Sequence, residues 1–144
     1  MSDATVIKKL RMKSGQRALI LNAPGDYMAG LGILPDDLVV STEAAAGEFD
    51  FVHVFARDSE ELERFAPAAI AASKDDAVLW FSYPKRSSGI ETDLSRDEGW
   101  RVVYAAGLRP VSQVSIDDVW SAVRFRSTEK VGKPWPPAER DKKG

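Results

Sequence analysis

The stretch FDFVHVFARDSEELERFAPAAIAASKDDAVLWFSY, residues 49–83, decides the fold. It opens with β-branched and aromatic residues at 49–56, a composition typical of a strand. An Asp-Ser cap and early glutamates, which favour the helix dipole, then predict a helix over 58–73. The apolar run at 77–83 predicts a second buried strand. The order strand, helix, strand indicates a parallel sheet with a helix packed on it.

Shorter elements are predicted on both sides of this unit. Before it, apolar runs at 17–22 and 37–42 predict two short strands, with at best a weak helix at 27–34 between them. After it, a helix is predicted over 93–106, because Gly107 stands where a C-terminal cap glycine belongs.

The end of the domain has an alternating pattern. Apolar and polar residues alternate at 111–116 and 119–126 around an Asp-Asp turn, which predicts an antiparallel hairpin. Arg124 and Arg126 share one face of it, and we interpret them as charges that protect an exposed edge strand, with an anion-binding surface as the alternative. Three tryptophans on separate elements are expected in the core: Trp80, Trp100 and Trp120.

The chain of 144 residues fits one domain. We place the domain at 16–126, after a polar, basic arm or short extended piece at 1–15 and before a charged, proline-containing tail at 127–144. The predicted fold class is α/β: a reduced Rossmann-like, mainly parallel sheet of five or six strands, with helices packed on it and a C-terminal antiparallel hairpin.

Composition limits the chemistry. The net charge of −2 argues against a nucleic-acid partner, because such proteins carry a basic excess. The chain has no cysteine and one histidine, which excludes disulfides, thiol catalysis and multi-histidine metal sites. Apolar runs are too short for a membrane helix and the N-terminus is polar, so we expect no membrane partner and a cytoplasmic location.

The order of elements over 49–126 resembles the C-terminal half of Rossmann-like class I methyltransferases. The resemblance implies a methyltransferase-like fold. The front half departs from that family. The glycines after its first strand, Gly25, Gly30 and Gly32, do not have the Gly-x-Gly-x-x-Gly spacing that lets backbone amides approach a cofactor, and the helix at 27–34 is too short for an ordinary βαβ unit.

Short motifs carry a second, more specific resemblance. They are YPK at 83–85, TDL at 92–94, Arg96-Asp97, Gly99-Trp100, WSA at 120–122 and RFR at 124–126. This set resembles a family of small bacterial proteins of unknown function and extends over most of residues 10–126. It implies a bacterial protein and no established activity.

The loop at 84–89 is the leading candidate site. It follows the carboxyl end of a central strand, where open α/β sheets bind ligands. Lys85, Arg86, Ser87 and Ser88 could hold a phosphate or carboxylate through charge-assisted hydrogen bonds. The simpler interpretation is a solvated loop that caps the next helix.

Two other sets of residues are weighed as sites. Asp93 and Asp97, spaced i,i+4 on the predicted helix, could form an acid/base pair or bind a cation; ion pairs with Arg96 or Arg101 are the simpler account. His53 has no catalytic partner near it in sequence, and we interpret it as a hydrogen-bonded sheet residue. We assign no catalytic or metal-binding residue.

The sequence therefore favours a non-enzymatic module, without a cofactor, that binds a small anionic ligand or a protein partner near the 84–89 loop. The alternative is a small methyltransferase-like or nucleotide-dependent enzyme with an atypical cofactor loop at 22–32. In that case Asn22, Gly25 and Glu43 would bind the cofactor, since Glu43 follows the second strand, where an acid would meet a ribose. The oligomeric state is left open.

Overall fold

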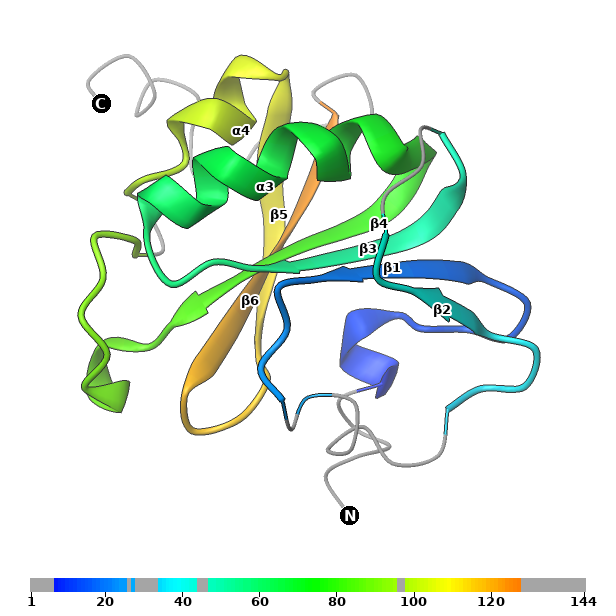
Figure 1. The fold of residues 1–144 in the computed structure, drawn as a ribbon, viewed down its shortest axis with the longest axis horizontal. Helices are drawn as coiled ribbons and strands as arrows, with labels where there is room; N and C mark the ends of the chain where they lie inside the picture. The colour runs from blue at the N-terminus through cyan, green and yellow to red at the C-terminus, as the bar shows by residue number, and fades with distance from the viewer. Residues whose placement is uncertain (1–6, 26, 28–33, 44–46, 96–97, 128–144) are drawn as a thin grey trace.

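A six-stranded mixed sheet organises the computed structural model, which describes residues 7–25, 27, 34–43, 47–95 and 98–127 (Figure 1). The strands are β1 (Arg17–Leu21), β2 (Val39–Ser41), β3 (Phe49–Phe55), β4 (Ser73–Pro84), β5 (Leu108–Ser115) and β6 (Trp120–Ser127). Their order in the sheet is β2-β1-β3-β4-β6-β5. The first four are parallel, and β6 is antiparallel to both β4 and β5. The predicted α/β sheet with a C-terminal antiparallel hairpin is confirmed.

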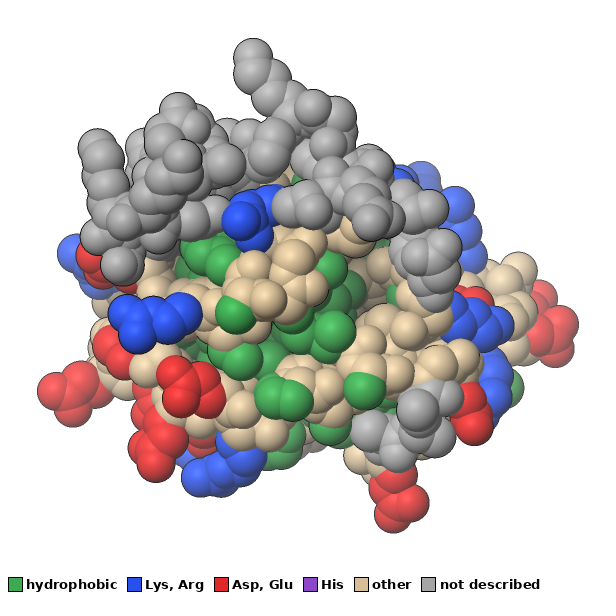
Figure 2. Space-filling model, turned by 90° about the horizontal axis from the view of Figure 1, so that it is seen from above, with side chains coloured by type: hydrophobic (Ala, Val, Ile, Leu, Met, Phe, Trp, Pro, Cys, Tyr) green, Lys and Arg blue, Asp and Glu red, His purple; other side chains and the backbone are tan. Residues whose placement is uncertain are grey.

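Two helices that follow β3 and β4 in the chain lie on one face of this sheet. α3 (Ser59–Ala72) and α4 (Arg101–Ala105) lie on the same side in Figure 1. Seen from that side, hydrophobic side chains are visible in the middle of the surface and charged side chains lie mostly at its margin (Figure 2). The central strands are buried on both faces, which explains why β3 reads as an almost continuous apolar run.

The predicted helix after β3 forms with its predicted cap. The Asp58 carboxylate accepts a hydrogen bond of 2.9 Å from the backbone N–H of Glu61. Leu62, Ala66 and Ala69 are fully buried against the sheet. The helix ends at Ala72 and β4 begins immediately, so the three charged residues at 74–76 belong to a strand and not to the end of the helix.

The N-terminal residues cover part of the opposite face of the sheet. Residues 7–10 are helical and lie on the other side from α3 in Figure 1, where the sequence suggested an arm or extended piece. Leu10 and Met12 are buried, and the Trp80 indole N–H donates to the Leu10 carbonyl at 2.8 Å. The physical reason is that residues 7–12 bury the apolar side chains on this face, including Trp80, away from water.

The second predicted helix is much shorter than 93–106. Of the residues described in this span, which leave out 96 and 97, Arg101–Ala105 alone is helical, because Gly99 takes a left-handed φ of 96° that breaks a helix. Leu94 is buried before the break, and Trp100 after it packs near Phe125, with ring centroids 5.2 Å apart. All three tryptophans expected in the core are buried there, at 1%, 1% and 8% exposure: Trp80, Trp100 and Trp120.

The strand that carries Arg124 and Arg126 is internal. β6 pairs with β4 on one side and with β5 on the other, so the sheet edges are β2 and β5. The interpretation of the two arginines as protectors of an edge strand is therefore wrong. The last strand of the hairpin is not the outermost strand, because it also pairs with β4.

Candidate functional site

The carboxyl ends of β1 and β3 form the topological switch point of the sheet. β1 lies between β2 and β3, so the chain leaves β1 toward one side and returns on the other. Connections that diverge in this way open a crevice beyond the strand ends, where ligands bind in open α/β folds. The residues that follow β1, β2 and β3 are therefore the first place to look for a site.

Asn22 spans this crevice at its base. Its backbone is left-handed, with φ of 59°, directly after the end of β1. Its side-chain amide donates to the Phe55 carbonyl at 2.9 Å and to a Glu61 carboxylate oxygen at 3.1 Å. Arg57 also donates to Glu61, at 2.7 Å from the guanidinium, and this bond is the main cause of a lowered Glu61 pKa. These contacts tie the ends of β1 and β3 together.

The other two cofactor candidates lie at the same end of the sheet, beyond the carboxyl ends of its parallel strands. Glu43 follows β2, its side chain is exposed, and its backbone N–H donates to the Ser41 hydroxyl at 3.2 Å. No described residue outside its immediate neighbours comes within 4 Å of where a Cβ on Gly25 would stand. The remainder of the 22–32 loop lies largely outside the described residues, at 26 and 28–33.

His53 lies in a buried hydrogen-bond chain. The Tyr27 hydroxyl is 2.8 Å from its Nδ1, and the Ser82 hydroxyl is 2.6 Å from its Nε2. His53 has no exposed surface, and burial lowers its pKa from 6.5 to about 3, while burial raises the pKa of Tyr27. The interpretation as a hydrogen-bonded sheet residue is confirmed. Sequence reasoning missed both partners, although Ser82 is a conspicuous hydroxyl within an apolar run.

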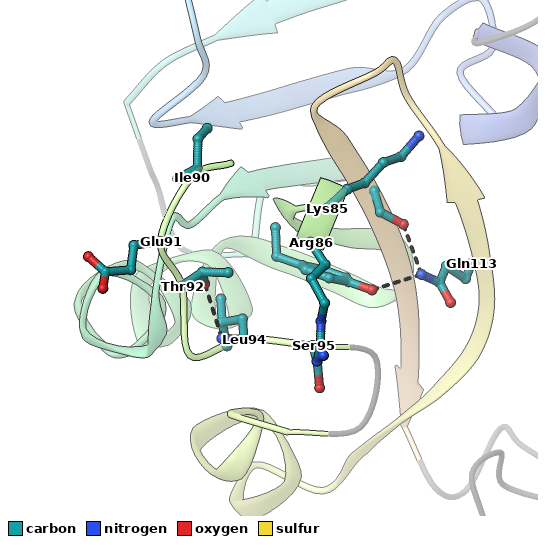
Figure 3. Close-up of a pocket in the computed structure, with 10 residues that line it drawn as sticks. Lys85, Arg86, Ile90, Glu91, Thr92, Leu94, Ser95 and Gln113 are labelled. Carbon is teal, nitrogen blue, oxygen red and sulfur yellow. Dashed lines mark hydrogen bonds between the residues drawn. The ribbon is translucent and has the colours of Figure 1, made fainter. Parts of the chain in front are cut away.

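A pocket of about 590 Å³ lies at the carboxyl end of β4 (Figure 3). Its lining comes from β4, β5, β6 and the segment after β4: Tyr83, Lys85, Arg86, Ile90, Glu91, Thr92, Leu94, Ser95, Gln113 and Ser121. Tyr83 and Ser121 are register partners on neighbouring strands, and the Gln113 side-chain amide donates to both of their hydroxyls. Sequence reasoning did not single out these three residues.

The anion-binding candidates divide between this pocket and the surface. Within the described part of the chain, the lining includes Lys85 and Arg86 but neither Ser87 nor Ser88. The Lys85 ammonium donates to the Ser115 hydroxyl at 2.6 Å. Ser87 is exposed, and the Ser88 hydroxyl accepts from the backbone N–H of Ile90 at 3.1 Å.

Asp93 binds the start of α3 instead of a helix of its own. It accepts hydrogen bonds from the backbone N–H and the hydroxyl of Ser59, and both bonds lower its pKa. Residues 93–95 are not helical, so the helical i,i+4 spacing does not apply to Asp93; its suggested partners Arg96 and Asp97 lie outside the described residues, and a pairing with them stays a prediction. Among the described side chains, no group of three or more potential ligands could hold a metal ion. None of the described helices has the length and apolar character needed to cross a membrane.

Comparison with solved structures defines the class of fold. A SAM-dependent methyltransferase from Aquifex aeolicus is similar at 16% identity and a TM-score of 0.52, with 85% of this chain and 88% of that chain covered. A ribosomal protein L11 methylase from Lactobacillus delbrueckii subsp. bulgaricus is similar at 11% identity and 0.52, with 87% and 77% covered. No protein-family model and no curated sequence matches. At these identities the likeness concerns the fold, which is the methyltransferase-like Rossmann fold.

Proposed function

We propose that the protein binds S-adenosylmethionine between the carboxyl ends of β1, β2 and β3 and acts as a small methyltransferase-like enzyme. The observation that carries the proposal is the placement of the Asn22 turn and Glu43 on neighbouring strand ends at the switch point. This function is the alternative that the sequence left open. The similarity in fold to methyltransferases supports it over a non-enzymatic module.

The residues present fit a nucleoside cofactor. The exposed Glu43 carboxylate has the chemistry to accept hydrogen bonds from ribose hydroxyls. The space that the described residues leave at Gly25 allows a ligand to approach the backbone, although the usual glycine spacing is lacking. Asn22 fixes the first turn of the loop through its bonds to the end of β3 and to α3. When bound, S-adenosylmethionine supplies an electrophilic methyl group; the chain binds and orients the nucleoside.

Isothermal titration calorimetry with S-adenosylmethionine and S-adenosylhomocysteine tests the proposal, with ATP as the comparison ligand. Glu43→Gln should weaken binding about tenfold or more, because charge-assisted hydrogen bonds contribute roughly 1.5–3 kcal/mol. Glu63→Gln is the matched control, since Glu63 is an exposed glutamate on α3 that is not among the residues proposed to bind the cofactor. Absence of binding by both sulfur compounds, or equal affinities for the two variants, would refute the proposal.

A further inference from the structure

We infer that the pocket at the carboxyl end of β4 binds a small organic anion, a carboxylate or phosphate group carried on an apolar body. The inference does not depend on S-adenosylmethionine, because it rests on different residues from those at the β1–β3 crevice. Three properties of the pocket support it: the hydrogen-bond donors of its floor, the balance of its charges, and its apolar wall.

The floor of the pocket offers unused donors. Gln113 donates one N–H to the Tyr83 hydroxyl at 2.9 Å and the other to the Ser121 hydroxyl at 2.8 Å. A hydroxyl that accepts keeps its own proton, and among the described residues the Tyr83 proton has no acceptor, although Tyr83 is only 7% exposed. If the amide is turned over, its two N–H groups become the free donors. The floor therefore suits a ligand that accepts hydrogen bonds.

The charges around the pocket favour an anion. Two cations, Lys85 and Arg86, line it together with a single carboxylate among the described residues, that of Glu91. The two cations point in different directions in Figure 3, and Ser115 holds the ammonium of Lys85 on the β5 side. Arg86 is exposed and has no acidic partner within the described part of the chain. Its guanidinium is thus available for the bidentate hydrogen bonds that carboxylates and phosphates accept.

The apolar part of the pocket wall favours a ligand that is larger than a bare ion. Ile90, Leu94 and the Tyr83 ring contribute apolar surface beside the polar groups. A volume of about 590 Å³ exceeds what inorganic phosphate needs and lies in the range of pockets for small organic ligands. A ligand with an anionic group near Arg86 and an apolar body against this wall would satisfy both parts.

The test uses the full chain without S-adenosylmethionine, and four probes. Benzoate and phenyl phosphate are the organic anions, benzamide is the neutral analogue, and inorganic phosphate is the bare anion. Titration followed by NMR should show saturable shifts of the Gln113 side-chain amide with benzoate or phenyl phosphate. Benzamide and inorganic phosphate should each bind at least about tenfold more weakly, because each lacks one of the two features.

Two variants and one control locate the site. Arg86→Gln should weaken binding of the organic anion about ten- to a hundredfold, and Tyr83→Phe should weaken it less. Arg64→Gln, which removes an exposed arginine of α3, should leave the affinity unchanged. The inference is overturned by a lack of saturable binding of both organic anions, by equal binding of benzamide, or by equal effects of the two arginine variants. If this inference fails, the proposal that the protein binds S-adenosylmethionine is not affected, and if the Glu43 experiment fails, this inference is not affected.

Discussion

Lowering the pH from 6.5 to 4.5 should destabilise the protein through its one histidine. In the folded chain, burial lowers the pKa of His53 to about 3, whereas an unfolded chain has a histidine pKa near 6.5. Between these values the unfolded state binds more protons than the folded state, from about half a proton at pH 6.5 to nearly one at pH 4.5. The slope of the free energy of unfolding approaches about 1.4 kcal/mol per pH unit once the unfolded histidine is fully protonated, so the loss over this interval is about 2 kcal/mol. The loss stops below the folded pKa.

Urea unfolding of the wild type and of His53→Gln at several pH values measures this effect. The variant keeps a polar side chain between Tyr27 and Ser82 but does not titrate. It should start less stable at pH 7 and should lose about 2 kcal/mol less than the wild type between pH 6.5 and 4.5. Carboxylates with lowered pKa values, such as Glu61, contribute equally to both proteins and cancel in the difference.

Since the chain has one histidine, its ring signal in an NMR spectrum needs no assignment. That signal should show no titration near pH 6.5 while the protein is folded. A midpoint near 6.5, or the same pH dependence of stability in the wild type and His53→Gln, would refute the reasoning.

Two further substitutions test the packing, the first of them with Gly89→Ala as its control. Gly99→Ala should cost about 1–3 kcal/mol in urea unfolding, because it combines a positive φ with a clash between the new Cβ and the Leu94 side chain. Gly89→Ala, with a positive φ but open space, should cost about 1 kcal/mol, so an equal or larger cost would contradict the clash. Trp80→Phe should remove the hydrogen bond to Leu10 and cost about 1–3 kcal/mol; unchanged hydrogen exchange at residues 7–12 would count against that link.

The parts of the fold that follow from local sequence were predictable. The strand at 49–56, the capped helix after it and the next strand each show their own periodicity, so their order indicates a parallel sheet. The position of β6 between β4 and β5 was not predictable in this way, because strand pairing between β4 and β6 joins distant segments. The helix expected over 93–106 is shorter than predicted because tertiary packing again decides the structure. Burial of Leu94 and Trp100 against the sheet outweighs the local helix pattern around Gly99.

The candidate site was predictable in position more than in composition. The rule that ligands bind at carboxyl ends of parallel strands led to the loops after β1 and β4 from sequence alone. The convergence of Tyr83, Gln113 and Ser121 depends on the register of three strands, which a single sequence does not specify. The bond between Tyr27 and His53 likewise joins two segments that no local pattern connects.

The cover that residues 7–12 give to the sheet has a consequence for the order of folding. Leu10 is bonded to Trp80, which is 70 positions further along the chain, and both share a cluster with Trp120. The earliest synthesised part of this cover therefore cannot dock until the strands that carry these tryptophans have been made. Contacts of such long sequence separation form slowly, because a large loop must close first. During that delay a newly made chain exposes an aromatic surface. Its aggregation during expression should therefore depend on how quickly residues 7–12 dock on that surface.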